Sequence, residues 1–185
     1  GADADRTVEE AEASTRTELG KHIYALNDET LEAVIVRLLA EHGKTLALAE
    51  SCTGGFIAHR LTNVPGASAV LLAGYVTYSN DAKQDLLGVQ DATLAAQGAV
   101  SEATVREMAE GARRRAKADY AIAVTGIAGP GGGSEEKPVG TVYIAVASAE
   151  RTVALKQFNR FDRETFKFVT AQQVLELLRR VVLGI

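Results

Sequence analysis

The sequence predicts an α/β fold: a three-layer α/β/α sandwich around a mixed, mostly parallel sheet. Short apolar segments alternate with amphipathic segments along most of the 185 residues, the pattern of strands joined by helices. Aromatic residues make up 5% of the chain and tryptophan is absent, so the core must be built from Ala, Val, Ile and Leu, which suits closely packed layers. The last two strand-like segments follow each other directly, so we expect a hairpin that adds an antiparallel strand.

The first half of the chain shows the alternation of helix and strand patterns. Asn27 or Asp28 is a suitable cap for the first amphipathic helix, and His42-Gly43 ends it. The expected elements are a helix over 29–41, a strand over 45–49, a helix over 56–61, a long strand over 69–79 with Gly74 as a bend, and a short helix capped by Asn80-Asp81.

The second half completes the alternation. Its expected elements are helices over 91–96 and 101–117, a strand over 119–124, a hairpin of 141–148 and 152–158, and a closing amphipathic helix over 162–183.

The net excess of negative charge is confined to the beginning of the chain. Residues 1–41 hold ten acids and four bases, whereas residues 42–185 hold fourteen acids and sixteen bases. Residues 1–14 contain a single large aliphatic residue, Val8, which is too little apolar surface to offset the entropy of ordering. We therefore expect an acidic segment over 1–27, partly disordered or helical, and one globular domain over 28–185.

Composition excludes several classes of protein. One cysteine rules out a disulfide scaffold and favours a reducing compartment, and no apolar run approaches the roughly 20 residues of a membrane span. A net charge of −4 argues against a dedicated nucleic-acid binder, and three scattered histidines do not form a metal site. The basic run 113–115 spreads around a helix and is better explained as a solvated face. We expect a cytoplasmic protein without metal, cofactor, membrane or direct nucleic-acid contacts.

The segment Ser51-Cys-Thr-Gly-Gly55 is the first candidate for chemistry. It follows a strand and opens a helix, which is where open α/β sheets bind ligands. Its hydroxyl and thiol groups are potential nucleophiles, and its two glycines let a substrate approach the backbone. The alternative is a helix cap with glycines that serve helix–sheet packing.

The second candidate is the strand-to-helix junction that contains Tyr78, Ser79, Asn80 and Lys83. Lys83 lies about one helical turn beyond Ser79 and can point back to the junction. A lysine held near apolar surface and a hydroxyl partner loses some of its preference for charge and can act as a base. The alternative is a solvated surface lysine.

The loop from Gly126 to Gly140 is the third candidate. It holds six of the 17 glycines and two of the three prolines. Its backbone N–H groups could form an anion nest, with Ser134 and Lys137 as further donors for a phosphate. The spacing matches neither the dinucleotide fingerprint nor the P-loop, so a disordered tip between two strands stays open.

Together these stretches resemble a known family. The motifs are Leu48-Ala-Glu-Ser-Cys-Thr-Gly-Gly55, Tyr75-Val-Thr-Tyr-Ser-Asn80 with Lys83, Gly98-Ala-Val-Ser101, Thr125-Gly-Ile-Ala-Gly-Pro-Gly-Gly-Gly133 and Lys137-Pro-Val-Gly-Thr141. In this order they resemble the C-terminal domain of the CinA competence/damage-inducible family, which is related to stand-alone nicotinamide-nucleotide amidases. The resemblance covers about residues 29–183.

The resemblance implies a function in NAD salvage, the pyridine nucleotide cycle. The family's fold is a three-layer sandwich, and its activity is hydrolysis of the carboxamide of nicotinamide mononucleotide to nicotinate mononucleotide and ammonia. Ser51 resembles the family's nucleophile and Lys83 its general base, with Tyr78 close by in the site. An oxyanion would be held by N–H groups near Thr53 and Gly54, and the glycine loop would hold the phosphate or ribose.

The expected substrate-binding set extends over all three segments. It comprises Thr53, Gly54, Gly55, Asn80, Thr125, Gly126, Gly129, Gly131, Ser134 and Lys137. Two alternatives stay open: Cys52 as the nucleophile, and a non-catalytic nucleotide-binding or regulatory module of a two-domain protein. The resemblance also implies an upstream domain, with residues 1–27 as the remnant of an interdomain segment, and the closing helix offers a surface for a homo-oligomer.

Overall fold

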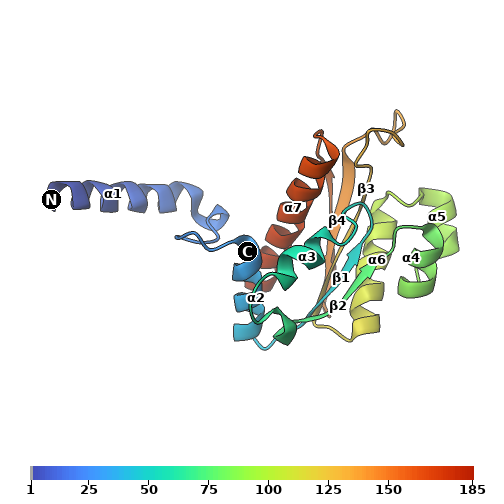
Figure 1. Cartoon of the computed structure of the whole chain (residues 1–185), viewed down its shortest axis with the longest axis horizontal. Coiled ribbons are helices and arrows are strands. Elements are labelled where there is room, and N and C mark those ends of the chain that lie inside the picture. The colour runs from blue at the N-terminus through green and yellow to red at the C-terminus, as the bar shows by residue number, and fades with distance from the viewer. Residues whose placement is uncertain (1) are drawn as a thin grey trace.

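The computed structural model describes residues 2–185 (Figure 1). In chain order its elements are α1 (Ala2–Leu19), η1 (Gly20–His22), α2 (Leu31–Glu41), β1 (Leu46–Glu50), α3 (Phe56–Thr62), η2 (Ala67–Ala69), β2 (Leu71–Val76), α4 (Asn80–Leu87), α5 (Asp91–Gln97), α6 (Glu102–Ala116), β3 (Tyr120–Gly126), β4 (Thr141–Ala147), β5 (Thr152–Phe158) and α7 (Arg163–Leu183).

The strands form one mixed sheet in the order β2-β1-β3-β4-β5. β1 pairs in parallel with both β2 and β3, whereas β4 is antiparallel to β3 and to β5. Four of the five strands therefore run in one direction and only β4 opposes them. This confirms the predicted mixed sheet and the antiparallel strand from the final hairpin.

Helices cover both faces of the sheet, so the predicted three-layer sandwich is confirmed. Figure 1 shows α2, α3 and α7 on one side and α4, α5 and α6 on the other. In β1, Leu46 and Leu48 belong to the core beneath the first group, and Ala47 and Ala49 belong to the core beneath the second. β3 and β4 also turn alanines toward α6. Small side chains on this face let α6 pack close to the strands.

Helix starts differ in detail from the prediction. Thr30 caps α2 by accepting a hydrogen bond from the Ala33 N–H, in place of Asn27 or Asp28. Ser79 caps α4 in the same way, so Asn80 is the first helical residue and not the cap. The predicted strand over 69–79 is shorter, because the chain leaves the sheet after Val76.

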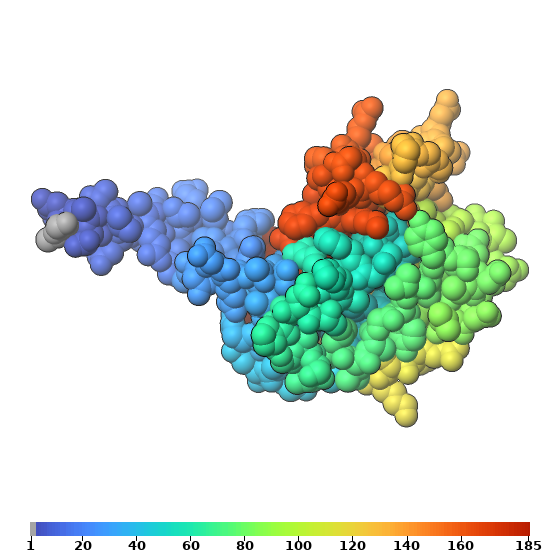
Figure 2. Space-filling view, in the orientation of Figure 1, coloured from blue at the N-terminus to red at the C-terminus, as the bar shows by residue number. Residues whose placement is uncertain are grey.

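The acidic beginning of the chain forms α1, which projects away from the sandwich (Figures 1 and 2). Its side-chain hydrogen bonds and ion pairs join residues within the helix itself. The next residues do contact the domain: Arg179 of α7 donates to the Lys21 carbonyl, and Arg180 lies 3.1 Å from Nδ1 of His22. The assignment of 1–27 to an interdomain segment stays a prediction. Among residues 2–185, no helix has the length and apolar character to cross a membrane.

Candidate active site

Ser51 lies at the end of β1, where the two parallel neighbours β2 and β3 also end. Its N–H donates to the Val124 carbonyl of β3, which anchors the residue at the sheet edge. The chain then turns sharply through Gly54 (φ 62°) and Gly55 (φ 94°) into α3. A left-handed backbone favours glycine at both positions.

Lys83, from the first turns of α4, extends back beneath Ser51. Its side chain is buried, with 1% exposed, and its Nζ lies 3.2 Å from Oγ of Ser51. The same nitrogen is 2.8 Å from the carbonyl oxygen of Thr77 and 3.4 Å from that of Ser79. The structure therefore brings the predicted nucleophile and base into hydrogen-bond distance.

The surroundings of Lys83 suit a neutral amine. Burial lowers the pKa of Lys83 below the usual lysine value. Within residues 2–185, no carboxylate forms an ion pair with its ammonium group. A neutral amine has two N–H donors, which match the two carbonyl oxygens, and one lone pair, which can accept the Ser51 hydroxyl proton.

A cleft of about 290 Å³ opens over this pair. Its lining includes seven of the predicted site residues: Ser51, Tyr78, Lys83, Thr125, Gly126, Gly129 and Gly131. Ala99, Val100 and Ile127 add an apolar wall. The Thr125 hydroxyl is buried and donates to the Ala99 carbonyl at 2.8 Å, which holds this wall against β3.

Tyr78 lies at the rim of the cleft and is bonded to a residue that the sequence patterns did not indicate. The tyrosine is 62% exposed, and its hydroxyl oxygen accepts from Nη2 of Arg163 at 2.8 Å. Nη1 of Arg163 donates to the Gly129 carbonyl, also at 2.8 Å. Arg163 is an ordinary helix-opening residue in the sequence, and only the packing of α7 beside the glycine loop reveals its place.

Other predicted residues do not line the cleft. Thr53 is buried, with no hydrogen-bond partner for its hydroxyl. The Gly54 N–H donates to the Ser51 carbonyl, so it is not free to hold an oxyanion as predicted, and the Gly55 N–H donates to Glu50. Asn80 is exposed on α4.

Ser134 and Lys137 form a turn within the glycine loop. The Ser134 N–H donates to the Lys137 carbonyl, and the Lys137 N–H donates to the Ser134 hydroxyl. Nζ of Lys137 donates to the Gln97 carbonyl at the end of α5, 2.7 Å away. Lys137 therefore fastens the loop to α5, and neither residue lines the cleft as a phosphate donor.

Glu50 is a second residue that the patterns did not single out. It is 1% exposed and accepts three backbone hydrogen bonds, from Gly55 (3.0 Å), Ile57 (3.1 Å) and Ala58 (2.8 Å). The available signal was an acidic residue at the end of an apolar strand, directly before the candidate nucleophile.

Cys52 also lines the cleft, but its thiol is poorly suited to attack. Burial raises its pKa to about 12. The thiolate is the nucleophilic form of cysteine, so a thiol with this pKa is almost wholly unreactive near neutral pH. The Ser51 hydroxyl, by contrast, lies 3.2 Å from Nζ of Lys83, a group that can take its proton.

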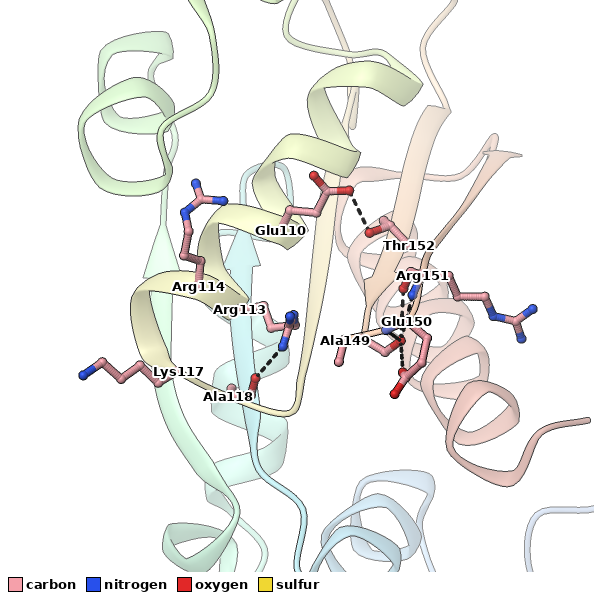
Figure 3. Close-up of a pocket in the computed structure, with 10 residues that line it drawn as sticks. Glu110, Arg113, Arg114, Lys117, Ala118, Ala149, Glu150, Arg151 and Thr152 are labelled. Carbon is pink, nitrogen blue, oxygen red and sulfur yellow. Dashed lines mark hydrogen bonds between the residues drawn. The ribbon is translucent and has the colours of Figure 1, made fainter.

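A larger hollow, of about 530 Å³, lies between the end of α6 and the β4–β5 turn. It holds basic side chains, but Figure 3 shows Arg114 and Lys117 pointing away from the 148–152 turn. Arg113 donates to the Ala118 carbonyl, and Arg114 and Arg115 donate to carbonyls of α4. These cations do not converge on a ligand. Among residues 2–185, no group of three or more His, Cys, Asp or Glu side chains could hold a metal ion.

Comparison with known proteins gives the family. The family model of the CinA C-terminal domain matches residues 28–182. The chain belongs to this family. A CinA-like protein from Geobacter sulfurreducens is 52% identical over 170 residues, which are 91% of this chain and 41% of the relative. A CinA-like protein from Syntrophus aciditrophicus is 49% identical over 180 residues, 97% of this chain and 43% of the relative. The chain therefore spans less than half the length of these relatives.

Solved structures of the CinA family share the fold. The competence/damage inducible protein CihA from Agrobacterium tumefaciens is 42% identical, with a TM-score of 0.76 over 83% of this chain and 97% of its own. The competence damage-inducible protein A from Klebsiella pneumoniae is 40% identical, with a TM-score of 0.78 over 80% of this chain and 92% of its own. Both of these proteins are named as competence/damage-inducible proteins.

Proposed function

We propose that this CinA domain is an amidase that converts nicotinamide mononucleotide to nicotinate mononucleotide and ammonia. The observation that carries the proposal is the distance of 3.2 Å between Nζ of Lys83 and Oγ of Ser51, inside a cleft and with the lysine buried. A nucleophile within hydrogen-bond reach of a base with a lowered pKa is the arrangement that covalent amide hydrolysis requires.

The reaction has two halves. Nζ of Lys83 takes the hydroxyl proton of Ser51 while Oγ bonds to the amide carbon, and the carbonyl electrons move to its oxygen. The C–N bond then breaks, Lys83 gives the proton to the departing nitrogen, and ammonia leaves an ester on Ser51. Water attacks this ester with Lys83 again as the base, and the proton returns to Ser51 as the carboxylate product departs.

The backbone beside Ser51 offers two donors for the oxyanion. Within residues 2–185, the N–H groups of Cys52 and Thr53 donate to no backbone carbonyl, whereas those of Ser51 and Gly54 are occupied. We assign the oxyanion to Cys52 and Thr53, one residue earlier than the sequence predicted. Donors fixed by the fold in this way stabilise the developing charge strongly, because they need no reorganisation during the reaction.

Arg163 is the cation best placed to meet the substrate's phosphate. It lines the same cleft as the Ser51–Lys83 pair, and its bonds go to two neutral groups, the Gly129 carbonyl and the Tyr78 hydroxyl. A guanidinium group has five N–H donors, so several remain for a phosphate. The apolar wall supports the ring, and the glycine loop borders the ribose and phosphate.

Ammonia release from nicotinamide mononucleotide tests the proposal. We expect wild type to release ammonia, and Ser51→Ala to lower kcat at least about a thousandfold, since the residual rate comes only from binding and the oxyanion donors. Ser68→Ala, an exposed serine of η2 outside the cleft, is the matched control and should keep full activity. Wild-type protein that releases no ammonia, with Ser51→Ala binding the nucleotide equally well, would overturn the proposal.

For a non-catalytic nucleotide-binding or regulatory module, Lys83 is expected beyond hydrogen-bond reach of Ser51. The observed distance between the two side chains argues against this alternative. The relatives are more than twice as long as this chain, so we propose that the domain acts beside an upstream domain. We also retain the proposal of a homo-oligomer, which sedimentation of the purified protein would test.

A further inference from the structure

Glu50 is a buried acid for which the reaction described above has no use. It directly precedes Ser51 and is 1% exposed. Within residues 2–185 it forms no ion pair with a lysine, arginine or histidine. Burying a carboxylate without a cation is costly unless hydrogen bonds replace its hydration. This acid must therefore be explained by its hydrogen bonds.

All three of these bonds go to the backbone that follows Ser51. One carboxylate oxygen accepts from the N–H groups of Gly55 and Ile57, and the other accepts from that of Ala58. These are donors that the start of a helix leaves unpaired, and a side chain at the cap position normally satisfies them. The cap position of α3 is Gly55, which has no side chain. The Glu50 carboxylate accepts these hydrogen bonds in its place, from the other end of the turn.

The carboxylate thereby determines which N–H groups of the turn remain open. It occupies the beginning of α3, so that helix end cannot bind the substrate. The Ser51 and Gly54 N–H groups are held by carbonyl oxygens. Of the N–H groups in the 51–55 turn, and among residues 2–185, those of Cys52 and Thr53 donate to no backbone carbonyl, and they lie between the two ends that Glu50 ties together.

We propose that Glu50 is a positioning residue: its carboxylate holds the 51–55 turn in the one shape that presents Ser51 and the two open N–H groups to the same carbonyl group. It touches neither substrate nor reacting atoms. The inference rests on the proposed amide chemistry for its role, but the geometry applies to any acyl or phosphonyl transfer to Ser51.

Steady-state kinetics on nicotinamide mononucleotide provide the first test. Glu50→Gln keeps the size and one acceptor oxygen but turns an NH2 group toward backbone donors. We expect kcat to fall about 10- to 100-fold, as when an oxyanion donor is misplaced, with KM changed less than about threefold. The pH midpoint set by Lys83 should not move, because burial and not the Glu50 charge lowers the pKa of Lys83.

The control separates positioning from stability. Thr30→Ala removes the cap of α2, away from the cleft, and should lower Tm while leaving kcat unchanged. If both Glu50→Gln and Thr30→Ala lower Tm and neither changes kcat, Glu50 contributes only to stability and the inference is wrong. Glu50→Asp keeps the charge on a shorter side chain and should give a kcat between those of wild type and Glu50→Gln.

A second readout does not depend on the natural substrate. A fluorophosphonate forms a P–O bond to Oγ of Ser51, fluoride leaves and Lys83 takes the hydroxyl proton, and the charge on the phosphoryl oxygen needs the same N–H donors. Intact-mass measurement gives the labelling rate, which we expect to be at least about tenfold slower in Glu50→Gln than in wild type.

The two readouts distinguish failure of this inference from failure of the proposed function. Equal labelling rates in wild type and Glu50→Gln overturn the positioning role even if the protein is a nicotinamide-nucleotide amidase. Slower labelling with no ammonia release by wild type supports the positioning role and rejects that substrate. If Glu50→Gln does not fold, Glu50→Asp decides by the same rates, and failure of both to fold shows a folding role and overturns the inference.

Discussion

Lys83 shows how a single residue acquires a chemical role from its surroundings. A lysine in water remains protonated at neutral pH, with a pKa of about 10.4. Burial of Lys83 penalises its charged form, while two carbonyl oxygens accept from its N–H groups in either protonation state. The lone pair of the neutral amine is left for Ser51, so burial rather than a neighbouring charge makes this residue a base.

The pH profile of kcat/KM tests this account. Lys83 must be neutral to accept the Ser51 proton, so activity should rise with pH and level off above the pKa of Lys83. Because that pKa is lowered, the midpoint should lie below the usual value of about 10.4. Lys83→Arg keeps a proton at every accessible pH and should lose the rising limb and at least about 99.9% of the activity. A wild-type midpoint at or above about 10.4 would contradict a lysine base whose pKa is lowered by burial.

A substitution of Cys52 tests whether Ser51 or Cys52 is the nucleophile. Since burial raises the pKa of its thiol to about 12, Cys52→Ala should keep activity within about tenfold of wild type, the loss reflecting packing alone. Iodoacetamide should modify the native protein much more slowly than the unfolded protein, as mass spectrometry can follow. Complete loss of ammonia release in a folded Cys52→Ala variant would make the thiol the nucleophile.

At the scale of the elements, the position of α4 against α6 sets where Lys83 lies. Gly111 of α6 meets the last residue of α4 so closely that a Cβ atom there would lie 2.0 Å from the Leu87 carbonyl oxygen. Glycine inside a helix costs about 1 kcal/mol relative to alanine. The close contact between the helices is the structural reason for glycine at this position.

Gly111→Ala should therefore destabilise the domain despite its better helix propensity. The clash is with backbone and cannot be relieved by a rotamer change, so we expect a net loss of about 1–3 kcal/mol in unfolding free energy and a fall in activity as α4 moves with Lys83. Thermal unfolding and ammonia release measure both effects. Gly131→Ala, where a Cβ meets nothing within 4 Å, is the control for Tm; an unchanged Tm in Gly111→Ala would show that α4 is not held in this way.

At the scale of the whole molecule, α1 and the sandwich are separate in structure. α1 projects from the domain, its described side-chain bonds are internal, and its single large aliphatic residue before Leu19 is 65% exposed. Stability of the domain comes from the two cores on either side of the sheet.

Removal of residues 1–19 should consequently leave the domain intact. We expect Tm to change by less than about 2 °C and kcat/KM by less than about twofold, because no buried apolar surface is lost. Residues 20–22 are kept in this variant, since Arg179 and Arg180 of α7 bind them. A marked fall in Tm would show that α1 folds back onto the domain in solution.

The sequence determined the layers, the order of the elements and the pair Ser51 and Lys83. Periodicity reports which faces are buried, and each motif lies within a few residues of a strand end, so both are encoded locally. Strand boundaries and caps were less certain: Thr30 and Ser79 compete with neighbouring residues that cap equally well.

The tertiary structure alone decided which groups share the cleft. Arg163 and Tyr78 are 85 positions apart, and Lys137 is 40 positions from the carbonyl that it binds. A local sequence pattern cannot reveal contacts between residues this far apart in the chain. The free or occupied state of the N–H groups after Ser51 likewise depends on a side chain, Glu50, that reaches up to eight residues along the chain. The acidity and the glycine content of the sequence were visible at once, but the chemistry follows from burial and hydrogen bonding, which exist only once the chain has folded.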